Sequence, residues 1–393
     1  MAKLSLKDIN VKGKRVLMRV DFNVPQDENL NVRDDTRIKE AMVSIKFLVD
    51  NGAKTILISH LGRPDGKIVE KMRMAPVAKA LEKLLGKPVL TAKDCIGEEV
   101  RKTVASMKDG DVLLLENVRF HAEEEENDPA FAKQLAELCD IYVNDAFGTA
   151  HRAHASTEGV AKYVKQAAAG FLMEKEIKYL GMVLTNPARP ILAIIGGAKI
   201  SSKIDLLNNL MSKVNTLIIG GGMAYTFMKA QGKGIGKSLL EADKVDVAKN
   251  ILNKAKEKGV KLLLPVDHVV ASTKDNPTDI KVVTDIPDNM TAFDIGPKSI
   301  AEFEKVVKES KTIFWNGPLG LFEVDAFATG TVSIAKAIAN SGNVSVVGGG
   351  DSVSAIKKAG VKAKITHIST GGGASLEFIE GKELPGIAAL TDK

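Results

Sequence analysis

Cysteine is scarce in this chain of 393 residues, which contains only Cys95 and Cys139. Two cysteines are too few for a disulfide framework or for a metal cluster built on cysteine, and this scarcity favours a reducing, cytoplasmic environment. Neither thiol stands in a recognisable catalytic context. We therefore expect both to be small residues of the core.

Long apolar runs are absent as well. None approaches the roughly 20 residues that a helix needs to span a bilayer. Met1 to Val16 alternate in charge, where a secretory signal would have a basic patch followed by an apolar stretch. We expect a protein that stays in the cytoplasm and has no membrane partner.

Aromatic residues make up only 5% of the chain, although its formal charge is +6. A basic balance suits either a nucleic-acid surface or a cleft that attracts anionic metabolites. No basic block alternates with stacking aromatics, which weakens the nucleic-acid interpretation. A basic protein that binds nucleotides or nucleic acid without turnover remains the competing hypothesis. The acidic run Glu123 to Glu126 is expected to be an exposed loop or helix start.

Short β-branched runs alternate with helical patterns along the chain, at the spacing of strand, crossover helix and strand. The expected strands are Val16 to Val20, Thr55 to Ser59, Val112 to Leu115, Ile141 to Val143, Ile191 to Ile195, Thr216 to Ile219, Lys261 to Leu264, Thr312 to Trp315 and Val344 to Val347. Apolar strands joined by helices imply parallel sheets covered on both faces. The length implies two cores, so we expect an α/β fold of two doubly wound, Rossmann-like domains.

This rhythm breaks between residues 170 and 190. Glu174 to Leu184 has a helical pattern, and Pro187 and Pro190 follow it closely. Prolines so placed end a helix and stiffen a connection. We expect a first domain over 1–173, an interdomain helix and hinge over 174–190, a second domain over 191–373, and a final segment over 374–393 that returns to the first domain.

Basic residues follow the strands of the first half. They include His60, Arg63, Arg119 and Arg152, and Arg37 opens the helix after the first strand. Open parallel sheets bind ligands at the carboxyl ends of their strands, and arginine suits a bidentate grip on carboxylate or phosphate. One such residue is more often a surface ion pair. Together they predict a site for a small, acidic and phosphorylated molecule.

Glycine follows the strands of the second half instead. The clusters begin at Gly196, Gly220, Gly317, Gly348 and Gly371. Glycine lets a ligand approach the backbone and leaves N–H groups at a helix start free to bind anions. A single cluster is equally well explained as a tight turn, but the repetition favours a nucleotide.

Two familiar phosphate-binding signatures are incomplete. Gly236-Lys237-Ser238 resembles the end of a Walker A loop, but Gln231 stands where its first glycine belongs. None of the glycine clusters completes the G-x-G-x-x-G pattern, so dinucleotide binding of the Rossmann type is unsupported.

Taken in order, the motifs resemble those of the phosphoglycerate kinase family over essentially the whole chain. They are Arg19 to Pro25, Ser59 to Pro64, Glu116 to Phe120, Asn144 to Ala155, Gly196 to Lys199, Trp315 to Pro318, Gly348 to Ser352 and Ser369 to Glu377. Members of that family transfer the acyl phosphate of 1,3-bisphosphoglycerate to ADP reversibly, giving 3-phosphoglycerate and ATP, with Mg²⁺. The resemblance also implies a monomer that needs no nucleic acid.

The resemblance implies roles for individual residues of this chain. Phosphoglycerate would be held by Asp21, Phe22, Asn23, Arg37, His60, Leu61, Gly62, Arg63, Arg119 and Arg152. The nucleotide would contact Lys199, Lys203, Gly220, Gly221, Ala292, Asn316, Pro318, Glu323, Gly349, Gly350, Asp351 and Ser352, with Asp351 on the metal. The catalytic set would be Arg37, Lys203, Gly371, Gly372 and Gly373.

The implied chemistry needs no general base. With ATP as donor the nucleophile is a carboxylate, which is already ionised at neutral pH, so positioning and charge stabilisation remain. Direct transfer also requires the two ligand-binding edges to meet, which predicts hinge closure about residues 174–184 and 371–373. Two residues depart from the family pattern: Ser202 replaces a common acid before Lys203, and Ala292 replaces a common glycine before Phe293.

Overall fold

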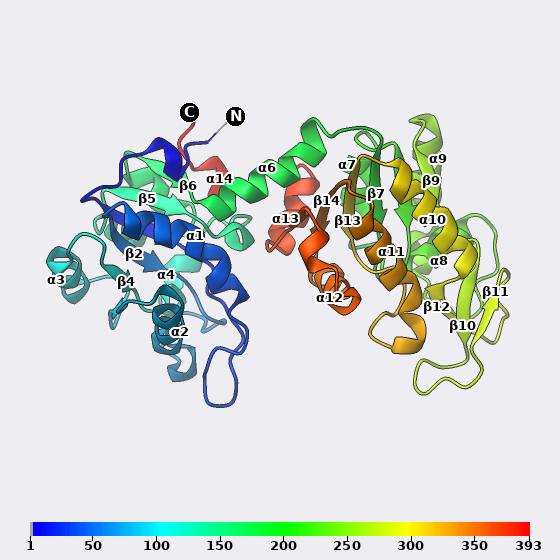
Figure 1. Cartoon of the computed structure of the whole chain (residues 1–393), viewed down its shortest axis with the longest axis horizontal. Helices are drawn as coiled ribbons and strands as arrows, with labels where there is room; N and C mark the ends of the chain where they lie inside the picture. The colour runs from blue at the N-terminus through cyan, green and yellow to red at the C-terminus, as the bar shows by residue number, and fades with distance from the viewer. Residues whose placement is uncertain (1–2) are drawn as a thin grey trace. The chain divides into compact units, whose positions relative to one another are not determined.

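The computed structural model describes residues 3–393, which cluster into two compact units. The first contains residues up to Lys178 together with Glu383–Lys393, and the second contains Tyr179–Lys382. Helix α6, Phe171–Thr185, is shared between them because the units divide within it (Figure 1). Residues 374–382, which were expected to belong to the returning segment, cluster with the second unit.

A parallel six-stranded sheet forms the first unit, in the order β3-β4-β2-β1-β5-β6. Its strands are β1 Arg15–Arg19, β2 Lys54–Ile58, β3 Leu90–Thr91, β4 Val112–Leu114, β5 Ile141–Asn144 and β6 Ala167–Ala169. Its helices are α1 Thr36–Asp50, α2 Ala75–Leu85, α3 Glu98–Ser106, α4 Ala122–Glu125, α5 Pro129–Ala136 and the terminal α14 Pro385–Ala388. Short 3₁₀ turns are η1 Leu6–Asp8, η2 Glu70–Met72, η3 Val118–Phe120, η4 Phe147–Thr149 and η5 Gly159–Tyr163.

One face of this sheet is covered by α1 and α2. Ile38 and Ile45 of α1 and Leu81 of α2 are fully buried, in one cluster with Val16 and Met18 of β1. Successive side chains of a strand point to opposite faces. Leu17 and Arg19 therefore face the other side, where they too are fully buried.

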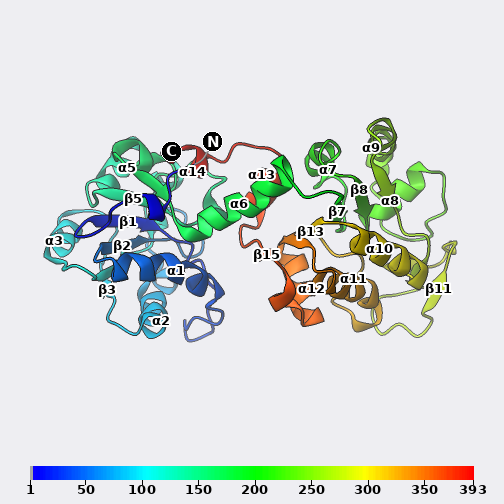
Figure 2. The same ribbon diagram turned by 45° about the horizontal axis from the view of Figure 1, so that its top comes forward.

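A second parallel six-stranded sheet forms the other unit, in the order β15-β14-β13-β7-β8-β9. Its strands are β7 Ile191–Ile195, β8 Thr216–Ile219, β9 Lys261–Leu263, β13 Thr312–Asn316, β14 Val344–Gly348 and β15 His367–Ile368. The helices are α7 Ile204–Leu210, α8 Met223–Ala230, α9 Val245–Glu257, α10 Pro297–Glu309, α11 Thr329–Asn340, α12 Gly350–Ala359 and α13 Gly373–Ile379, with turns η6 Ala242–Lys244, η7 Asp325–Phe327 and η8 Lys362–Lys364. Figure 2 shows α7, α8 and α9 on the side of β7 and β8 opposite α10 and α11.

An antiparallel sheet of three strands was not expected from the sequence. Strand β10, His268–Ala271, pairs with β11, Lys281–Val283, and with β12, Thr291–Ile295. These strands are short, and their neighbours lack the regular alternation that marks a strand in the sequence. The two larger sheets confirm the predicted α/β fold of doubly wound parallel sheets.

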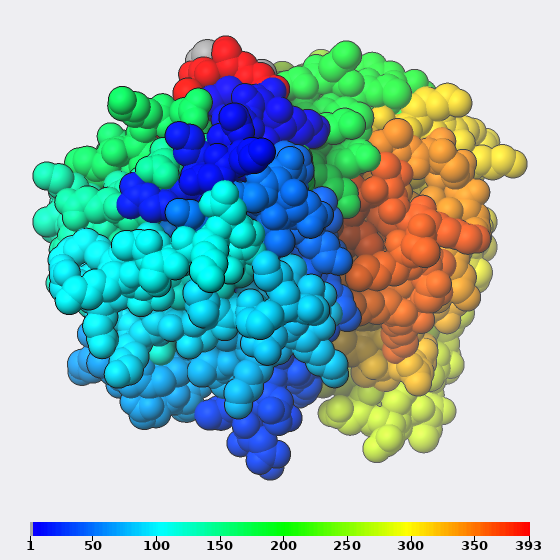
Figure 3. Space-filling view, turned by 60° about the vertical axis from the view of Figure 1, so that its left-hand side comes forward, coloured from blue at the N-terminus to red at the C-terminus, as the bar shows by residue number. Residues whose placement is uncertain are grey.

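The first and last of the described residues pack on the first unit. Lys3 pairs with Asp392 in an antiparallel bridge, and the N–H of Thr391 donates to the carbonyl of Ala167 at the edge strand β6 at 2.9 Å. Leu390 is buried. Figure 3 shows the last residues, in red, against the first described residues, in blue. Both cysteines are free and buried, as expected. No helix among residues 3–393 is long and apolar enough to cross a bilayer.

Candidate active site

The loop after β1 carries three predicted substrate residues. Asp21 and Arg37 form an ion pair, with 2.7 Å between Oδ2 and Nη1. The Oδ1 of Asn23 accepts a hydrogen bond from the N–H of Gly62 at 2.9 Å, which ties the loops after β1 and β2 together. Phe22 is fully buried, so its ring anchors this loop in the core.

The loop after β2 is joined in turn to the loop after β4. The Nδ2 of Asn117 donates to the carbonyl of Leu61 at 2.8 Å, and Nη1 of Arg119 donates to the carbonyl of Gly62 at 3.2 Å. Arg119 is buried, and its Nε lies 3.2 Å from Oε1 of Glu125. The loops after three neighbouring strands thus hold one another in place.

Arg63 and Arg152 are less constrained. Arg63 is exposed and forms no hydrogen bond or ion pair with residues 3–393. Arg152 is half-buried, with its Nε 3.3 Å from Nε2 of His151. Its charge also helps to lower the pKa of His154 to about 4, after burial, Arg119 and Arg19. Arg152 therefore belongs to the same basic cluster, whereas no hydrogen bond or ion pair with a described residue holds Arg63 beside it.

Positive charge dominates this edge of the sheet. Burial holds the pKa of His60 well below its usual range, and Arg19, Arg119 and Arg37 lower it further. Burial lowers the pKa of Arg119 as well, although Glu125 opposes this. A bound anion would relieve the repulsion between these groups. The geometry and charge therefore fit an acidic, phosphorylated small molecule.

Arg19 is a residue of this cluster that was not among the predicted site residues. Its side chain is fully buried, donates from Nε to Ser156 Oγ at 2.8 Å, and lies 3.1 Å from Nδ1 of His60 through Nη2. A charged side chain is almost never buried without partners. Its place in the predicted strand Val16 to Val20, whose other residues are all apolar, is the signal that could have identified it.

The second unit has its own candidate site, where the strand order reverses between β7 and β13. The N–H of Gly196 donates to the carbonyl of Asn316 at 2.9 Å, and the N–H of Gly197 to that of Pro318 at 3.2 Å. A Cβ on Gly221, whose φ is +70°, would lie 2.6 Å from the carbonyl oxygen of Gly197. Glycine is required here because three backbone segments converge. Ligands bind at such reversal points in open α/β sheets.

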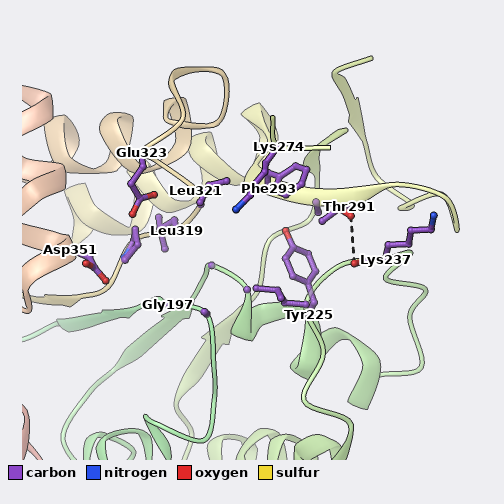
Figure 4. Close-up of a pocket in the computed structure, with 17 residues that line it drawn as sticks. Gly197, Tyr225, Lys237, Lys274, Thr291, Phe293, Leu319, Leu321, Glu323 and Asp351 are labelled. Carbon is purple, nitrogen blue, oxygen red and sulfur yellow. Dashed lines mark hydrogen bonds between the residues drawn. The ribbon is translucent and has the colours of Figure 1, made fainter. Parts of the chain in front are cut away.

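A cavity of about 370 Å³ opens beside these glycines (Figure 4). Figure 4 shows Glu323 and Asp351 on one side of it and Tyr225, Thr291 and Lys237 on the other. Its lining residues are Gly197, Ala198, Gly221, Gly222, Tyr225, Lys237, Leu239, Lys274, Thr291, Ala292, Phe293, Pro318, Leu319, Gly320, Leu321, Glu323 and Asp351. The lining is mostly apolar, with carboxylates and lysines at the margins, as in many small-molecule sites.

Five of the predicted nucleotide residues line this cavity: Gly221, Ala292, Pro318, Glu323 and Asp351.

Others form a hydrogen-bonded network around the loops after β13 and β14. Lys203 Nζ donates to Asn316 Oδ1 at 2.5 Å, and Asn316 Nδ2 donates to the carbonyl of Gly348 at 2.8 Å. The N–H of Gly317 donates to Ser352 Oγ at 2.6 Å. Burial lowers the pKa of Lys203. The network holds a lysine close to the start of α12.

The remaining glycines of the predicted site serve the backbone. Gly349 has a φ of +93° and precedes the first residue of α12, Gly350. Gly220 packs beneath Leu319, where a Cβ would overlap the leucine. Lys199 is exposed.

In the run that was expected to stabilise charge, Gly371 already donates its N–H to Ser369 Oγ at 3.3 Å. Gly372 has a φ of +54°, and α13 begins at Gly373.

Comparison with known proteins decides the family. The family model for phosphoglycerate kinase matches residues 6–382. A phosphoglycerate kinase from Koribacter versatilis is 59% identical and one from Pelotomaculum thermopropionicum is 58% identical, each over the whole of both chains. The solved phosphoglycerate kinase from Coxiella burnetii is 44% identical, with a TM-score of 0.92 over 98% of both chains. That from Pyrococcus horikoshii is 33% identical, with a TM-score of 0.80 and the same coverage.

The chain belongs to the phosphoglycerate kinase family.

Membership in this family makes the chain a transferase and a kinase of glycolysis. The predicted family, fold class and enzyme activity are thereby confirmed.

The residues around Asp351 fit the magnesium that the family resemblance implies. Asp351 is exposed and lines the cavity, and Mg²⁺ in phosphoryl-transfer sites is held by one or two carboxylates together with phosphate oxygens. Within residues 3–393, a close group of metal-capable side chains lies instead in the first unit, at Asp94, Cys95 and His121. It contains a buried thiol, and Oδ1 of Asp94 already lies 2.7 Å from Nε2 of His121. That set does not suit magnesium.

Several cavity residues have no counterpart in the sequence prediction. Tyr225, Leu239 and Lys274 stand in no recognisable motif. Lys237 belongs to the incomplete Walker A motif, and Phe293 entered the prediction only as the residue that follows Ala292. Apolar lining carries no chemical signature in a sequence. These positions come from separate parts of the chain and meet only in the folded unit.

The expectation for the acidic run Glu123 to Glu126 needs a correction. It was expected to be exposed, and Glu123, Glu125 and Glu126 are, but Glu124 is fully buried. Its oxygens accept hydrogen bonds from the N–H and the hydroxyl of Ser156, a partner 32 positions away.

Proposed function

We propose that the chain transfers the acyl phosphate of 1,3-bisphosphoglycerate to ADP, and reversibly the γ-phosphate of ATP to 3-phosphoglycerate. The basic cluster of the first unit binds the phosphoglycerate, and the cavity of the second unit binds ADP or ATP. The observation that carries this proposal is the pairing of one anion-binding edge with one nucleotide-sized cavity in a member of the phosphoglycerate kinase family.

Arg37 is the cation best placed to act on the transferring group. Its ion pair with Asp21 fixes its direction, and its guanidinium is partly exposed, so it remains accessible to a ligand. Charge on the equatorial oxygens of the phosphoryl group is stabilised by such cations. Lys203 would serve the same end from the second unit, with Asn316 holding its ammonium. Magnesium, when bound at Asp351, supplies further charge neutralisation on the phosphates.

No residue needs to remove a proton. The carboxylate of 3-phosphoglycerate attacks as an anion, so the histidines of the cluster bind and orient. The low pKa of His60 is consistent with this, because a neutral imidazole donates a hydrogen bond without taking up a proton. We further propose that closure about α6 and residues 371–373 brings the two ligands together, and that the enzyme acts as a cytoplasmic monomer. Two free, buried cysteines suit a reducing compartment.

A coupled assay of ADP formation tests the proposal. ADP should form from ATP only when 3-phosphoglycerate and Mg²⁺ are both supplied. Arg37→Ala should lower kcat by at least about a hundredfold, the usual order for losing a charge-stabilising group. Arg33→Ala, an exposed arginine four positions away, serves as the control. ATP hydrolysis without phosphoglycerate, or full activity of Arg37→Ala, would contradict the proposal.

A further inference from the structure

A buried chain of hydrogen bonds lies beneath the basic cluster of the first unit. It runs from Glu124 through Ser156 and Arg19 to His60. Glu124, Ser156 and Arg19 are fully buried, and His60 is 4% exposed. Four buried polar side chains in contact must satisfy one another, because an unmet polar group in the interior is costly.

The direction of each hydrogen bond follows from what the groups can do. Arginine only donates, so Ser156 Oγ accepts from Arg19 Nε at 2.8 Å. The one hydroxyl proton of Ser156 is then directed to Glu124 Oε1 at 2.6 Å. Glu124 Oε2 accepts from the N–H of Ser156 at 2.8 Å. Both carboxylate oxygens are thus used as acceptors.

The same reasoning assigns the tautomer of His60. Nη2 of Arg19 lies 3.1 Å from Nδ1 of His60. Because the guanidinium must donate, Nδ1 must accept, and a neutral imidazole then carries its proton on Nε2. Nε2 has no hydrogen-bond partner among residues 3–393. It is the ring atom left to donate to a ligand oxygen.

Ser156 is held from other directions too. The hydroxyl of Tyr142, in β5, donates to the carbonyl of Ser156 at 2.7 Å, and the N–H of Ala155 donates to the backbone carbonyl of Glu124 at 2.9 Å. Nδ1 of His154, two positions before Ser156, lies 3.9 Å from Glu124 Oε1. Glu124 therefore anchors the whole turn that carries Arg152 and His154.

We propose that Glu124 is a positioning residue which, through Ser156 and Arg19, holds His60 as the Nε2–H tautomer and so presents a hydrogen-bond donor to the phosphoglycerate. This rests on the proposed function for the identity of the ligand, but the tautomer itself is a property of the free protein. Glu124 does not touch the substrate. It acts by keeping the guanidinium of Arg19 aimed at Nδ1.

The test begins with the ligand-free wild-type protein. Long-range ¹⁵N–¹H correlation spectra of ¹⁵N-histidine-labelled protein distinguish the two neutral tautomers, with His60 assigned by His60→Gln. We expect the Nε2–H form. A predominant Nδ1–H form in the wild type would by itself overturn the proposal, before Glu124 or Ser156 is substituted.

Variants then test the coupling. Ser156→Ala removes the hydroxyl between Arg19 and Glu124 but keeps the backbone bond to Glu124. It should mix the His60 tautomers and raise the KM for 3-phosphoglycerate about tenfold, the effect of one buried hydrogen bond to a charged group. The KM for ATP should stay within twofold. Ser156→Thr keeps the hydroxyl and should restore both readouts.

Glu124→Gln provides the second arm, with the exposed Glu126→Gln as its matched control. Glu124→Gln should reproduce the effect of Ser156→Ala, and Glu126→Gln should resemble the wild type. Unchanged tautomer and unchanged KM in both Glu124→Gln and Ser156→Ala would overturn the proposal. A wild type without turnover that still shows the Nε2–H form would contradict the proposed function and leave the assigned tautomer standing.

Discussion

Single residues in this protein owe their importance to partners that are remote in the chain. The strand ends indicated His60, Arg119 and the glycine turns, because the carboxyl edge of a parallel sheet is set by the strands alone. The sequence did not indicate that Glu124 is buried. Its partner Ser156 lies 32 positions away, and Arg19, which bonds to that serine, is 137 positions from it. No local pattern contains that information.

Gly221 is the residue where backbone geometry is expected to control nucleotide binding most directly. In Gly221→Ala the new Cβ would lie 2.6 Å from the carbonyl oxygen of Gly197 and 2.9 Å from that of Pro318. Because both contacts are with backbone atoms, no side chain can rotate away to relieve them. The backbone that forms the cavity wall must therefore shift. We expect the KM for ATP to rise at least about tenfold, since 1.4 kcal/mol is enough for this change, with the KM for 3-phosphoglycerate unchanged.

Gly232→Ala is the matched control for that prediction. Gly232 also has a positive φ, +80°, but a Cβ there meets nothing within 4 Å. It should lose about 1 kcal/mol of stability from the left-handed conformation alone and keep normal kinetics. Equal KM values for ATP in Gly221→Ala and the wild type would show that the close approach of these three segments does not shape the cavity.

Asp294 should make the stability of the second unit depend on pH. Oδ2 accepts from the N–H of Gly330 at 2.7 Å, whereas Oδ1 has no partner among the described residues. Burial raises the pKa of Asp294 from 3.8 to about 7. The folded state therefore holds a proton that the unfolded state releases, and stability falls as the pH rises from about 4 to about 7.

Asp294→Asn removes that titration. The unfolding free energy of the wild type minus that of Asp294→Asn should decrease by up to about 4 kcal/mol across this interval. Denaturant unfolding at several pH values measures it. His268, whose pKa burial lowers to about 4, is present in both proteins, so its titration cancels in the difference. Parallel pH profiles for the two proteins would mean that Asp294 is not held in its neutral form.

Among the elements, the buried central strands were predictable and the marginal ones were not. The bounds of β7 match the expected strand, and β1 and β2 differ from expectation by one residue at each end. The inner residues of these strands are largely apolar on both faces, which marks them in a sequence. Strand β6 is three alanines, and β3 has only two residues. Such strands form because a neighbouring strand offers hydrogen bonds. The amino-acid sequence of the short strand itself therefore contains no pattern that predicts it.

The segment Glu383–Lys393 is expected to stabilise the edge of the first unit. It supplies a hydrogen bond to Ala167 in β6, and the N–H of Gly386 donates to the carbonyl of Ala150 at 2.8 Å. Leu390 is buried there. Ending the chain at Lys382 should cost at least about 2 kcal/mol, the usual loss for one buried leucine.

Hydrogen exchange followed by mass spectrometry locates this effect. Peptides covering β5 and β6 should lose protection in the shortened chain. Peptides covering β13, in the other unit, are the internal control and should exchange as in the full chain. Unchanged protection of β6 would mean that the segment contributes no stability to that edge.

The whole molecule has two units with separate cores, and the proposed function assigns one ligand to each unit. A ligand that binds only the folded form of one unit stabilises that unit by RT ln(1 + [L]/Kd), which is about 2.7 kcal/mol at a hundredfold excess over Kd. Mg²⁺ with ADP should therefore slow hydrogen exchange within Tyr179–Lys382, around β7, β8 and β13. 3-Phosphoglycerate should slow it within the first unit, around the loops after β1, β2 and β4.

Helix α6 is where the two effects should meet, because its first residues belong to one unit and its last residues to the other. If closure about α6 follows the binding of both ligands, the protection of its peptides in the ternary complex should exceed the sum found with each ligand alone. Gly221→Ala should weaken the ADP effect on the second unit and leave the 3-phosphoglycerate effect on the first intact. Additive protection of α6 would indicate that the two units respond to their ligands independently. It would contradict closure about α6.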